Sequence, residues 1–344
     1  MGDHDGLGRV SSPAHNGTVT RKAEGTTIIS QASDLQSEPL LVITGPTAVG
    51  KSEVALAVAE RLSAEIISAD SRQVYRYMDV GTGKPSTVER ARVPHHMVDV
   101  AYPDEPYSIA RYRLAAERAI EEVIRRDRLP LVVGGSPHYL QALLDRLEPA
   151  GQSPALRAWL QRVDAARASS ALDRWLRTLD PDTAQQVDPR NRRRVLRAIE
   201  VILVTGRPFS QAGRRRSQSV PALWIGLRRD RAALRERIQL RVASMIDAGW
   251  LHEVRTLLLM GYAPSLPAMS ATGYPELARV VTGERTLDEA AQRIRFATQA
   301  FLRRQETWLR SETRIQWIDA DQPEAVAGVI AAWRDFLHNR SQSA

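Results

Sequence analysis

A glycine-rich segment near the start of the chain limits the possible folds more than any other feature. Residues 45–52 read Gly-Pro-Thr-Ala-Val-Gly-Lys-Ser and match the pattern G-x-x-x-x-G-K-[ST]. The segment follows the apolar run 39–44 and precedes residues 52–62, where apolar side chains recur at helical spacing. In this strand–loop–helix context, loop amides and a helix N-terminus together favour an anion. The pattern therefore predicts a P-loop that binds a phosphate chain, without saying which one.

The side chains of this loop have separate expected tasks. The Lys51 ammonium would neutralise phosphate oxygens, and the Ser52 hydroxyl would offer an oxygen to Mg²⁺, the expected cofactor. The remaining positions would supply backbone amides and the turn that aims them. The predicted phosphate-binding residues are Gly45, Pro46, Thr47, Ala48, Val49, Gly50, Lys51 and Ser52.

Strand-like and helical patterns alternate along most of the chain. Strands are expected at 39–44, 64–69, 129–133 and 222–227, and long helical stretches at 52–62, 109–126, 231–260 and 286–311. Such alternation predicts an α/β fold with a parallel sheet and crossover helices. Together with the loop, it indicates a P-loop NTPase-like core with a mainly helical insertion domain.

Changes in composition suggest where the domains begin and end. Residues 1–37 are rich in Ser, Thr, Gly and Ala without periodicity, which predicts a disordered tail. Residues 38–150 and 217–325 are expected to form the α/β core with C-terminal helices. Residues 151–216 carry no good strand and form the helical insertion, and residues 326–344 form a C-terminal helix and tail.

The positive charge of the protein is concentrated in the insertion. Residues 151–216 contain 14 arginines and no lysine against six acidic residues, a net charge of +8 that equals the formal charge of the whole chain. Asp188-Pro189 is expected to start a helix, with Asp as N-cap and Pro at the first position. On that helix Arg190, Arg193, Arg194 and Arg197 would share one face, opposite an apolar face. A basic stripe of this kind can follow a nucleic-acid backbone or simply face solvent.

The overall composition excludes several classes of protein. The chain has no cysteine, which excludes disulfides, cysteine nucleophiles and cysteine-based zinc sites. No apolar run reaches the roughly 18–20 residues of a membrane span, and no secretory signal is present. A cytoplasmic, monomeric protein without a membrane or an obligate protein partner is the resulting expectation. His95 and His96 lack a nearby third ligand and are therefore expected to be structural or to position substrate.

A series of motifs runs in order along the chain from about residue 41 to residue 310. Beyond the P-loop, these segments are 70–85, 94–96 with Asp99, 103–108, 132–136 with Tyr139, 187–189, 194–200, 205–208, 268–269, 273–274 with Glu276, and 304–310. The P-loop alone is generic, whereas the ordered set is specific. The set resembles one family, the tRNA dimethylallyltransferases (tRNA isopentenyltransferases) of bacterial type without a zinc finger.

The resemblance implies transfer of a dimethylallyl group from dimethylallyl diphosphate to N6 of the adenosine 3′ of the anticodon, tRNA position 37. The implied partners are dimethylallyl diphosphate and the anticodon stem-loop of tRNA. Asp70 matches the general base, and Lys51 and Ser136 complete the implied catalytic set. The implied tRNA-binding residues are Asp70, Ser71, Arg72, Gln73, Ser136, Arg157, Arg193, Arg194, Val195, Leu196 and Arg197.

Some alternatives remain open at this level. Asp70 could instead be an N-cap or position Mg²⁺, and Ser136-Pro-His-Tyr139 departs from the family's usual Thr-Gly-Leu-Tyr. A small-molecule kinase would share the P-loop fold, and a nucleotide-driven remodeller of nucleic acids would share the loop. An enzyme that prenylates free adenine nucleotides is a third alternative, although the long insertion argues for a macromolecular acceptor.

Overall fold

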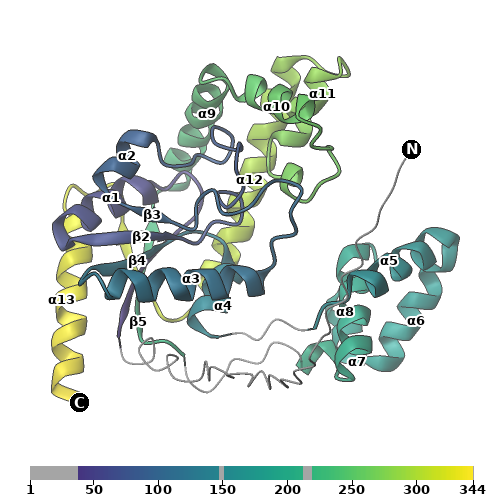
Figure 1. Cartoon of the computed structure of the whole chain (residues 1–344), viewed down its shortest axis with the longest axis horizontal. Coiled ribbons are helices and arrows are strands. Elements are labelled where there is room, and N and C mark those ends of the chain that lie inside the picture. Colours follow the sequence, from purple (N-terminus) through teal and green to yellow (C-terminus); the bar gives the residue numbers. More distant parts are fainter. Residues whose placement is uncertain (1–37, 147–150, 212–218, 344) are drawn as a thin grey trace, which may run out of the picture. The chain divides into compact units, whose positions relative to one another are not determined.

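The computed structural model describes residues 38–146, 151–211 and 219–343, so the predicted tail at 1–37 lies outside the described residues. Within these ranges, parallel strands form a single sheet with the spatial order β3-β2-β4-β1-β5-β6 (Figure 1). The strands are β1 (Leu40–Thr44), β2 (Ala64–Ser68), β3 (His95–His96), β4 (Leu129–Val133), β5 (Ala222–Arg228) and β6 (Ile315–Asp319). The predicted α/β class is confirmed.

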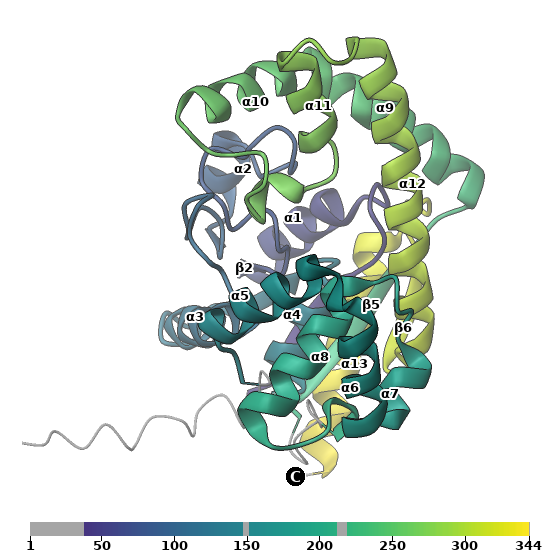
Figure 2. The same cartoon turned by 90° about the vertical axis from the view of Figure 1, so that its right-hand side faces the viewer.

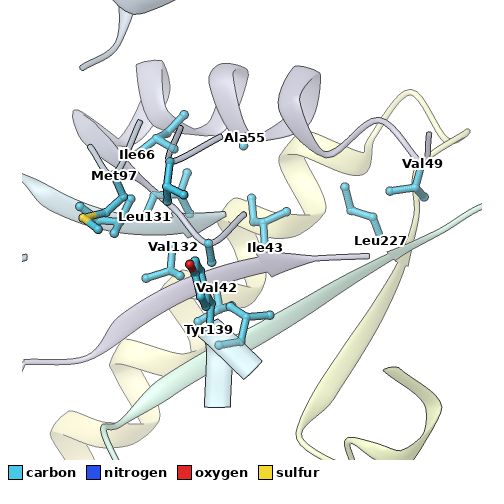
Figure 3. Packing of buried hydrophobic residues seen from close by; sticks show 14 of the residues in the cluster. Val42, Ile43, Val49, Ala55, Ile66, Met97, Leu131, Val132, Tyr139 and Leu227 are labelled. Atoms are coloured by element: carbon cyan, nitrogen blue, oxygen red, sulfur yellow. The ribbon is translucent and has the colours of Figure 1, made fainter. Parts of the chain in front are cut away.

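Strand β1 lies in the middle of the sheet and is buried along its whole length. Leu41 is in register with Leu131 of β4 on one side and with Leu223 of β5 on the other. Successive side chains point to opposite faces: Ile43 points toward Ala55 of helix α1, and Val42 toward Tyr139 of helix α4 (Figure 3). A strand covered on both faces reads as a continuous apolar run, which is why its position was recognisable in the sequence.

The helices of the core lie on both sides of the sheet and in a lobe beyond it. Helices α1 and α13 contact each other, as do α3 and α4, while α9 to α12 pack together as the lobe (Figures 1 and 2). Their bounds are α1 Lys51–Leu62, α2 Thr87–Arg92, α3 Ile109–Ile124, α4 Pro137–Leu144, α9 Arg231–Asp247, α10 Trp250–Leu259, α11 Tyr274–Val281, α12 Leu287–Ser311 and α13 Ala325–Ser343. No helix of the described residues is long and apolar enough to cross a membrane.

The insertion has a hydrophobic core of its own, separate from that of the sheet. It contains α5 (Pro154–Val163), a π-helical segment (Asp164–Ala168), α6 (Ser169–Leu179), α7 (Pro181–Gln186), α8 (Arg192–Thr205) and a 3₁₀ turn (Phe209–Gln211). Its buried cluster consists of Leu160, Leu172, Leu176, Val187, Val195, Leu196, Ala198, Ile199 and Ile202. The described part of 151–216 is helical, as predicted.

Two sequence expectations about helices were wrong. The stretch 231–260 is two helices, because Gly249 has a φ of 96°, a left-handed conformation that ends α9 and starts α10. Helix α8 starts at Arg192 with Asn191 as its N-cap, not at Asp188. The Asp188 carboxylate instead accepts from the amide of Arg190, so Arg190 lies before the helix and outside its basic face.

Short strands β3 and β6 were not predicted. Strand β3 contains only two residues, too few for a periodic pattern. Strand β6 reads Ile-Gln-Trp-Ile-Asp, and only its first residue is buried. An edge strand of this kind is selected by pairing with β5 and not by its own apolar content.

Candidate active site

The P-loop joins the carboxyl end of β1 to the first turn of α1. Gly50 is the N-cap residue of α1, so the free amides of the first turn face the loop. The Lys51 Nζ donates to the carbonyl oxygens of Gly45 and Pro46, at 2.9 and 2.8 Å. The ammonium group thus lies across the loop, bound to carbonyls that phosphate oxygens would replace as acceptors.

A glutamine of α12 holds this loop from a distant part of the chain. The Gln305 Oε1 accepts from the amide of Thr47 at 2.9 Å, and its Nε2 donates to the carbonyl of Gly135 at 2.9 Å. Only 6% of Gln305 is exposed, so water competes little for either bond. Gln305 therefore sets the spacing between the P-loop and the segment after β4. It lies in the matching block 304–310, but sequence reasoning gave it no role.

Arginines of the C-terminal half bind the other side of the P-loop. The Arg237 Nε donates to the Ala48 carbonyl at 2.9 Å, and the Arg229 Nε to the Val49 carbonyl at 3.3 Å. These bonds attach the loop to α9 and to the end of β5. Sequence reasoning missed both arginines, because a charged residue on a long helix or just after a strand carries no signal of the loop against which it packs.

A third cation, Arg241 of α9, lies close to the loop that follows β2. A Cβ atom built on Gly83 would lie 2.2 Å from the Arg241 Nη2, so the guanidinium packs directly against this glycine and would have to shift for a larger residue. Desolvation lowers the pKa of Arg241, and the nearby carboxylate of Asp70 opposes that shift. Arg241 is therefore a neighbour of the predicted general base that the sequence did not reveal.

Lys51 shares this electrostatic environment. Desolvation lowers its pKa to about 8; Asp70 raises the pKa and Arg241 lowers it further. Two cations thus lie near one carboxylate. A site of this kind favours an added anion, because a diphosphate would relieve the repulsion between Lys51 and Arg241.

The segment after β2 brings Asp70 and Ser136 onto neighbouring chain segments. One Asp70 oxygen, Oδ1, accepts from the amide of Arg72 at 2.8 Å. Among the described residues, the second oxygen has no hydrogen-bond partner. The Ser71 amide donates to the Oγ of Ser136 at 3.0 Å, and Ser136 is the N-cap residue of α4. Because β2 and β4 are adjacent parallel strands, their carboxyl ends place these residues at one edge of the sheet.

Arg72 and Gln73 brace the site internally. The Arg72 Nη1 donates to the carbonyl of Pro267 at 2.8 Å. The Gln73 Oε1 accepts from Ser68 Oγ at 2.9 Å, and its Nε2 donates to the Gly83 carbonyl at 3.0 Å. These bonds connect the segment after β2 with the next loop and with the segment before α11. Both were predicted to contact tRNA, and these bonds engage their side chains with the protein.

Two stacked tyrosines pack beside the end of β2. The rings of Tyr112 and Tyr139 have centroids 3.8 Å apart and planes 14° from parallel. The Tyr112 hydroxyl donates to the carbonyl of Ser68 at 3.1 Å. Burial raises the pKa of both phenols, with nearby tyrosines and Asp70 acting in the same direction. The two stacked phenols are therefore uncharged and form a packed aromatic surface near the carboxylate of Asp70.

A carboxylate of α10 holds the loop between β2 and α2. The Glu253 Oε2 accepts from the amides of Asp79 and Val80 at 2.7 and 2.6 Å, and Oε1 from the amide of Gly81 at 3.2 Å. The Tyr274 hydroxyl also donates to Oε1, at 2.7 Å. Three consecutive amides converging on one anion fix the loop conformation. Glu253 was not selected from the sequence.

In the insertion, two of the predicted tRNA-binding arginines are engaged internally. The Arg157 Nε and Nη2 donate to the two oxygens of Glu200, each at 3.0 Å. The Arg197 Nη1 donates to the same carboxylate at 2.9 Å. The Glu200 side chain is completely buried, so both arginines compensate an internal negative charge.

The remaining residues of α8 that were predicted to bind tRNA lie on two different faces of the helix, one exposed and one buried. Arg193 and Arg194 are exposed and, within the described residues, form no ion pair. Val195 and Leu196 are 1% and 8% exposed and belong to the core of the insertion, so their side chains pack inward. Only the first pair has side chains free to bind a phosphate backbone.

The histidine pair has a structural contact, as expected. The His96 Nε2 lies 2.7 Å from the Oε2 of Glu65, and His95 Nδ1 lies 2.7 Å from the carbonyl of Val93. No group of three or more His, Asp or Glu side chains suited to a metal ion occurs among the described residues. Any metal here would therefore be held mainly by a ligand and by isolated oxygens such as the exposed Ser52 hydroxyl.

A strand–loop–helix cradle, with cations and one carboxylate at the carboxyl edge of a parallel sheet, defines the class of P-loop proteins, whose loop geometry suits a phosphate chain. Comparison with known proteins narrows this class. The family model described as "IPP transferase" matches residues 73–312, and the model "Isopentenyl transferase" matches residues 39–95. The chain belongs to the IPP transferase family.

Individual relatives agree with this assignment. A tRNA dimethylallyltransferase of Thermomicrobium roseum is 43% identical over 288 residues, covering 83% of this chain and 88% of the relative. The structure of a tRNA isopentenylpyrophosphate transferase from Bacillus halodurans is 33% identical, with a TM-score of 0.66 over 89% of this chain and 98% of that one. A eukaryotic dimethylallyltransferase acting on tRNA is 26% identical, with a TM-score of 0.74 over 88% of this chain and 80% of that one. These matches confirm the P-loop NTPase-like core and favour neither the kinase nor the remodeller.

Proposed function

We propose that the protein transfers a dimethylallyl group from dimethylallyl diphosphate to N6 of the adenosine 3′ of the anticodon, tRNA position 37. The products are N6-dimethylallyladenosine in tRNA and diphosphate. The observation that carries the proposal is the Asp70 carboxylate, with one oxygen unpartnered among the described residues, beside Lys51 and Arg241. The names of the family's members supply the substrates.

The cationic side of the site suits the leaving group. As the carbon–oxygen bond of the donor breaks, negative charge develops on the departing diphosphate. Lys51, Arg241 and the amides of the P-loop are the groups that would stabilise that charge, since Lys51 lies across the loop and Arg241 is close to Asp70. Preorganised groups of this kind stabilise a transition state more than a ground state, because they need not reorganise as charge appears.

The acidic side of the site suits the acceptor. The N6 amine of adenine attacks C1 of the dimethylallyl group with its lone pair, and it must then lose a proton. The Asp70 carboxylate takes that proton on the oxygen that is not bound to the Arg72 amide. To come within reach of the carboxylate, the base must leave its stack in the anticodon loop.

We expect Mg²⁺ to be coordinated jointly by the protein and the diphosphate of the donor. The Ser52 hydroxyl is exposed in the first turn of α1 and has no side-chain or backbone partner among residues 38–146, 151–211 and 219–343. Ser52 would hold the ion together with diphosphate oxygens, in keeping with the preference of Mg²⁺ for few protein ligands. When bound, the ion would supply positive charge to the leaving group.

Substitution of Asp70 by asparagine tests the proposed base. Asn keeps the shape and the acceptor for the Arg72 amide but takes up no proton. The rate of transfer to unmodified tRNA under single-turnover conditions should fall by about 10²–10⁴-fold. The affinities for tRNA and dimethylallyl diphosphate should change little, because proton transfer belongs to the transition state.

The exposed carboxylate of Asp335 on α13 offers a matched control, and Asp335→Asn should keep the wild-type rate. If Asp70 organised Mg²⁺ instead, Asp70→Asn would bind the donor weakly and regain part of its rate at high Mg²⁺. Near-normal turnover of Asp70→Asn would exclude both roles. Absence of prenylated tRNA in the wild-type reaction would overturn the proposed function itself.

A further inference from the structure

Two tryptophans lie exposed on neighbouring helices of the insertion. Trp159 of α5 is 41% exposed and Trp175 of α6 is 40% exposed. Their ring centroids are 6.2 Å apart and their planes are 19° from parallel. The two indoles are therefore stacked with nearly parallel rings, and part of each ring system faces solvent.

This surface is not used by the core of the insertion. The buried cluster consists of aliphatic side chains, and neither tryptophan belongs to it. Elsewhere in the described chain, Trp224, Trp250 and Trp333 are at most 5% exposed, whereas Trp317 of the edge strand β6 is 37% exposed. Leaving part of an indole in water loses some of its large favourable burial, so an exposed pair of stacked indoles on a small helical unit indicates a surface that binds a ligand.

The charges around the pair indicate what kind of ligand fits. Arg162 lies one helical turn after Trp159, and Arg174 directly precedes Trp175. Both arginines are exposed, and neither forms an ion pair within the described residues. Some other arginines of the insertion are engaged in ion pairs, such as Arg157 with Glu200 and Arg192 with Asp164. Flat aromatic faces beside unpaired cations match single-stranded nucleic acid, whose bases stack while its phosphates seek positive charge.

We propose that Trp159 and Trp175 form a stacking platform for an unpaired base of the tRNA, with Arg162 and Arg174 binding adjacent phosphates. This inference rests on the proposed function, since it takes tRNA as the acceptor. The platform deepens that function by adding a base-stacking contact outside the P-loop site. An exposed pyrimidine or purine suits it equally, because stacking uses the face of a base and not its edge.

The test compares the full-length protein with the double variant Trp159→Ala/Trp175→Ala. The dissociation constant for an anticodon stem-loop RNA should rise about 10- to 100-fold, the scale expected for losing one stacked base. The constant for a fully paired RNA duplex with the same number of phosphates should stay the same. The slope of log affinity against log salt should also stay the same, since no charge is removed. Trp159→Phe/Trp175→Phe should restore most of the affinity.

Controls separate this platform from folding and from the proposed function. Phe296 of α12 is 60% exposed, and Phe296→Ala should bind both RNAs as the wild type does. Donor binding by the double variant should be unchanged. Equal loss for stem-loop and duplex, or no loss at all, would overturn the platform. A wild-type dimer that becomes monomeric in the double variant would assign the surface to a second copy instead. Prenylation by the double variant at saturating tRNA would leave the proposed function intact in each case.

Discussion

At the scale of single residues, the free site contains two like charges that repel each other and one carboxylate that compensates them. Lys51 donates to two carbonyls of its own loop, and desolvation lowers its pKa to about 8. Arg241 adds a second positive charge, and Asp70 is the compensating anion. The free site therefore holds its lysine close to the point of losing a proton, and an anionic donor would raise the pKa again.

This balance predicts how donor binding depends on pH. Below about pH 8 the free enzyme carries a charged Lys51 and binds dimethylallyl diphosphate without taking up a proton. Above about pH 8 the free enzyme loses that proton while the complex keeps it, so the dissociation constant should rise by up to about tenfold per pH unit. Titration calorimetry from pH 6.5 to 9.5, without tRNA, measures this. Arginine stays charged over this pH range, so Lys51→Arg should not show the rise in dissociation constant above pH 8. If it does, another group is responsible for the pH dependence.

At the scale of elements, long-range bonds decide where loops lie. Glu253 of α10 anchors residues 79–81 by three amides, and the same loop continues to Gly83, against which Arg241 packs. The helical lobe of α9 to α12 thereby determines the position of a loop that lies beside the base. The lobe and the loop are expected to lose their order together.

Glu253→Gln tests this anchor. The amide NH₂ group of Gln would face donors that the carboxylate accepted, so at least one backbone amide loses its partner. The free energy of unfolding should fall by about 1.5–3 kcal/mol, and the transfer rate should fall as well. Denaturant titration and single-turnover rates measure the two effects. Tyr274→Phe removes only the hydroxyl contact, so it should lower the free energy of unfolding by less than Glu253→Gln does. A larger decrease for Tyr274→Phe would show that Tyr274, and not Glu253, is the main anchor.

The arginines of the insertion should separate into two functional groups. Arg193→Ala/Arg194→Ala removes exposed charges and should weaken tRNA binding, with a log–log salt slope that is shallower by roughly 0.7–0.9 per lost phosphate contact. Arg157→Ala leaves the buried Glu200 short of a partner and should lower the free energy of unfolding by about 1–3 kcal/mol. Binding isotherms at several salt concentrations and melting curves distinguish them. An unchanged salt slope in the first variant would place tRNA on another face.

At the scale of the whole molecule, the core and the insertion each have their own hydrophobic cluster. The chain leaves the core after α4 and returns before β5, and the Val220 amide donates to the Leu144 carbonyl at 2.9 Å. The two crossing points are therefore neighbours. A short connection can replace the insertion without separating α4 from β5.

This arrangement predicts that the insertion can be removed. A chain in which a short Gly-Ser linker joins Arg146 to Ser219 should fold and bind dimethylallyl diphosphate with wild-type affinity. It should lose most of its affinity for tRNA, since Arg193 and Arg194 are gone. Titration calorimetry measures the affinity for the donor, and an electrophoretic mobility-shift experiment measures the affinity for tRNA. Failure of the shortened chain to bind the donor would show that the core needs the insertion.

Local patterns in the sequence determined much of this protein. The P-loop and the strands β1, β2, β4 and β5 were predicted within about two residues, because buried strands are continuous apolar runs and the loop has a fixed glycine spacing. Asp70 was also recognised, through the motif that follows β2. Its role as base stays a prediction. These features depend on residues that are neighbours in the chain.

Only the tertiary structure revealed the rest of the site. Gln305 binds Thr47 across 258 positions, and Arg241 and Glu253 reach loops far from them in sequence. The same is true of Arg157, whose partner Glu200 lies on a different helix. A sequence pattern records the spacing along one helix or strand, and it holds no record of which helix will pack beside which loop. Charged and amide side chains therefore acquire their partners, and with them their function, only when the chain folds.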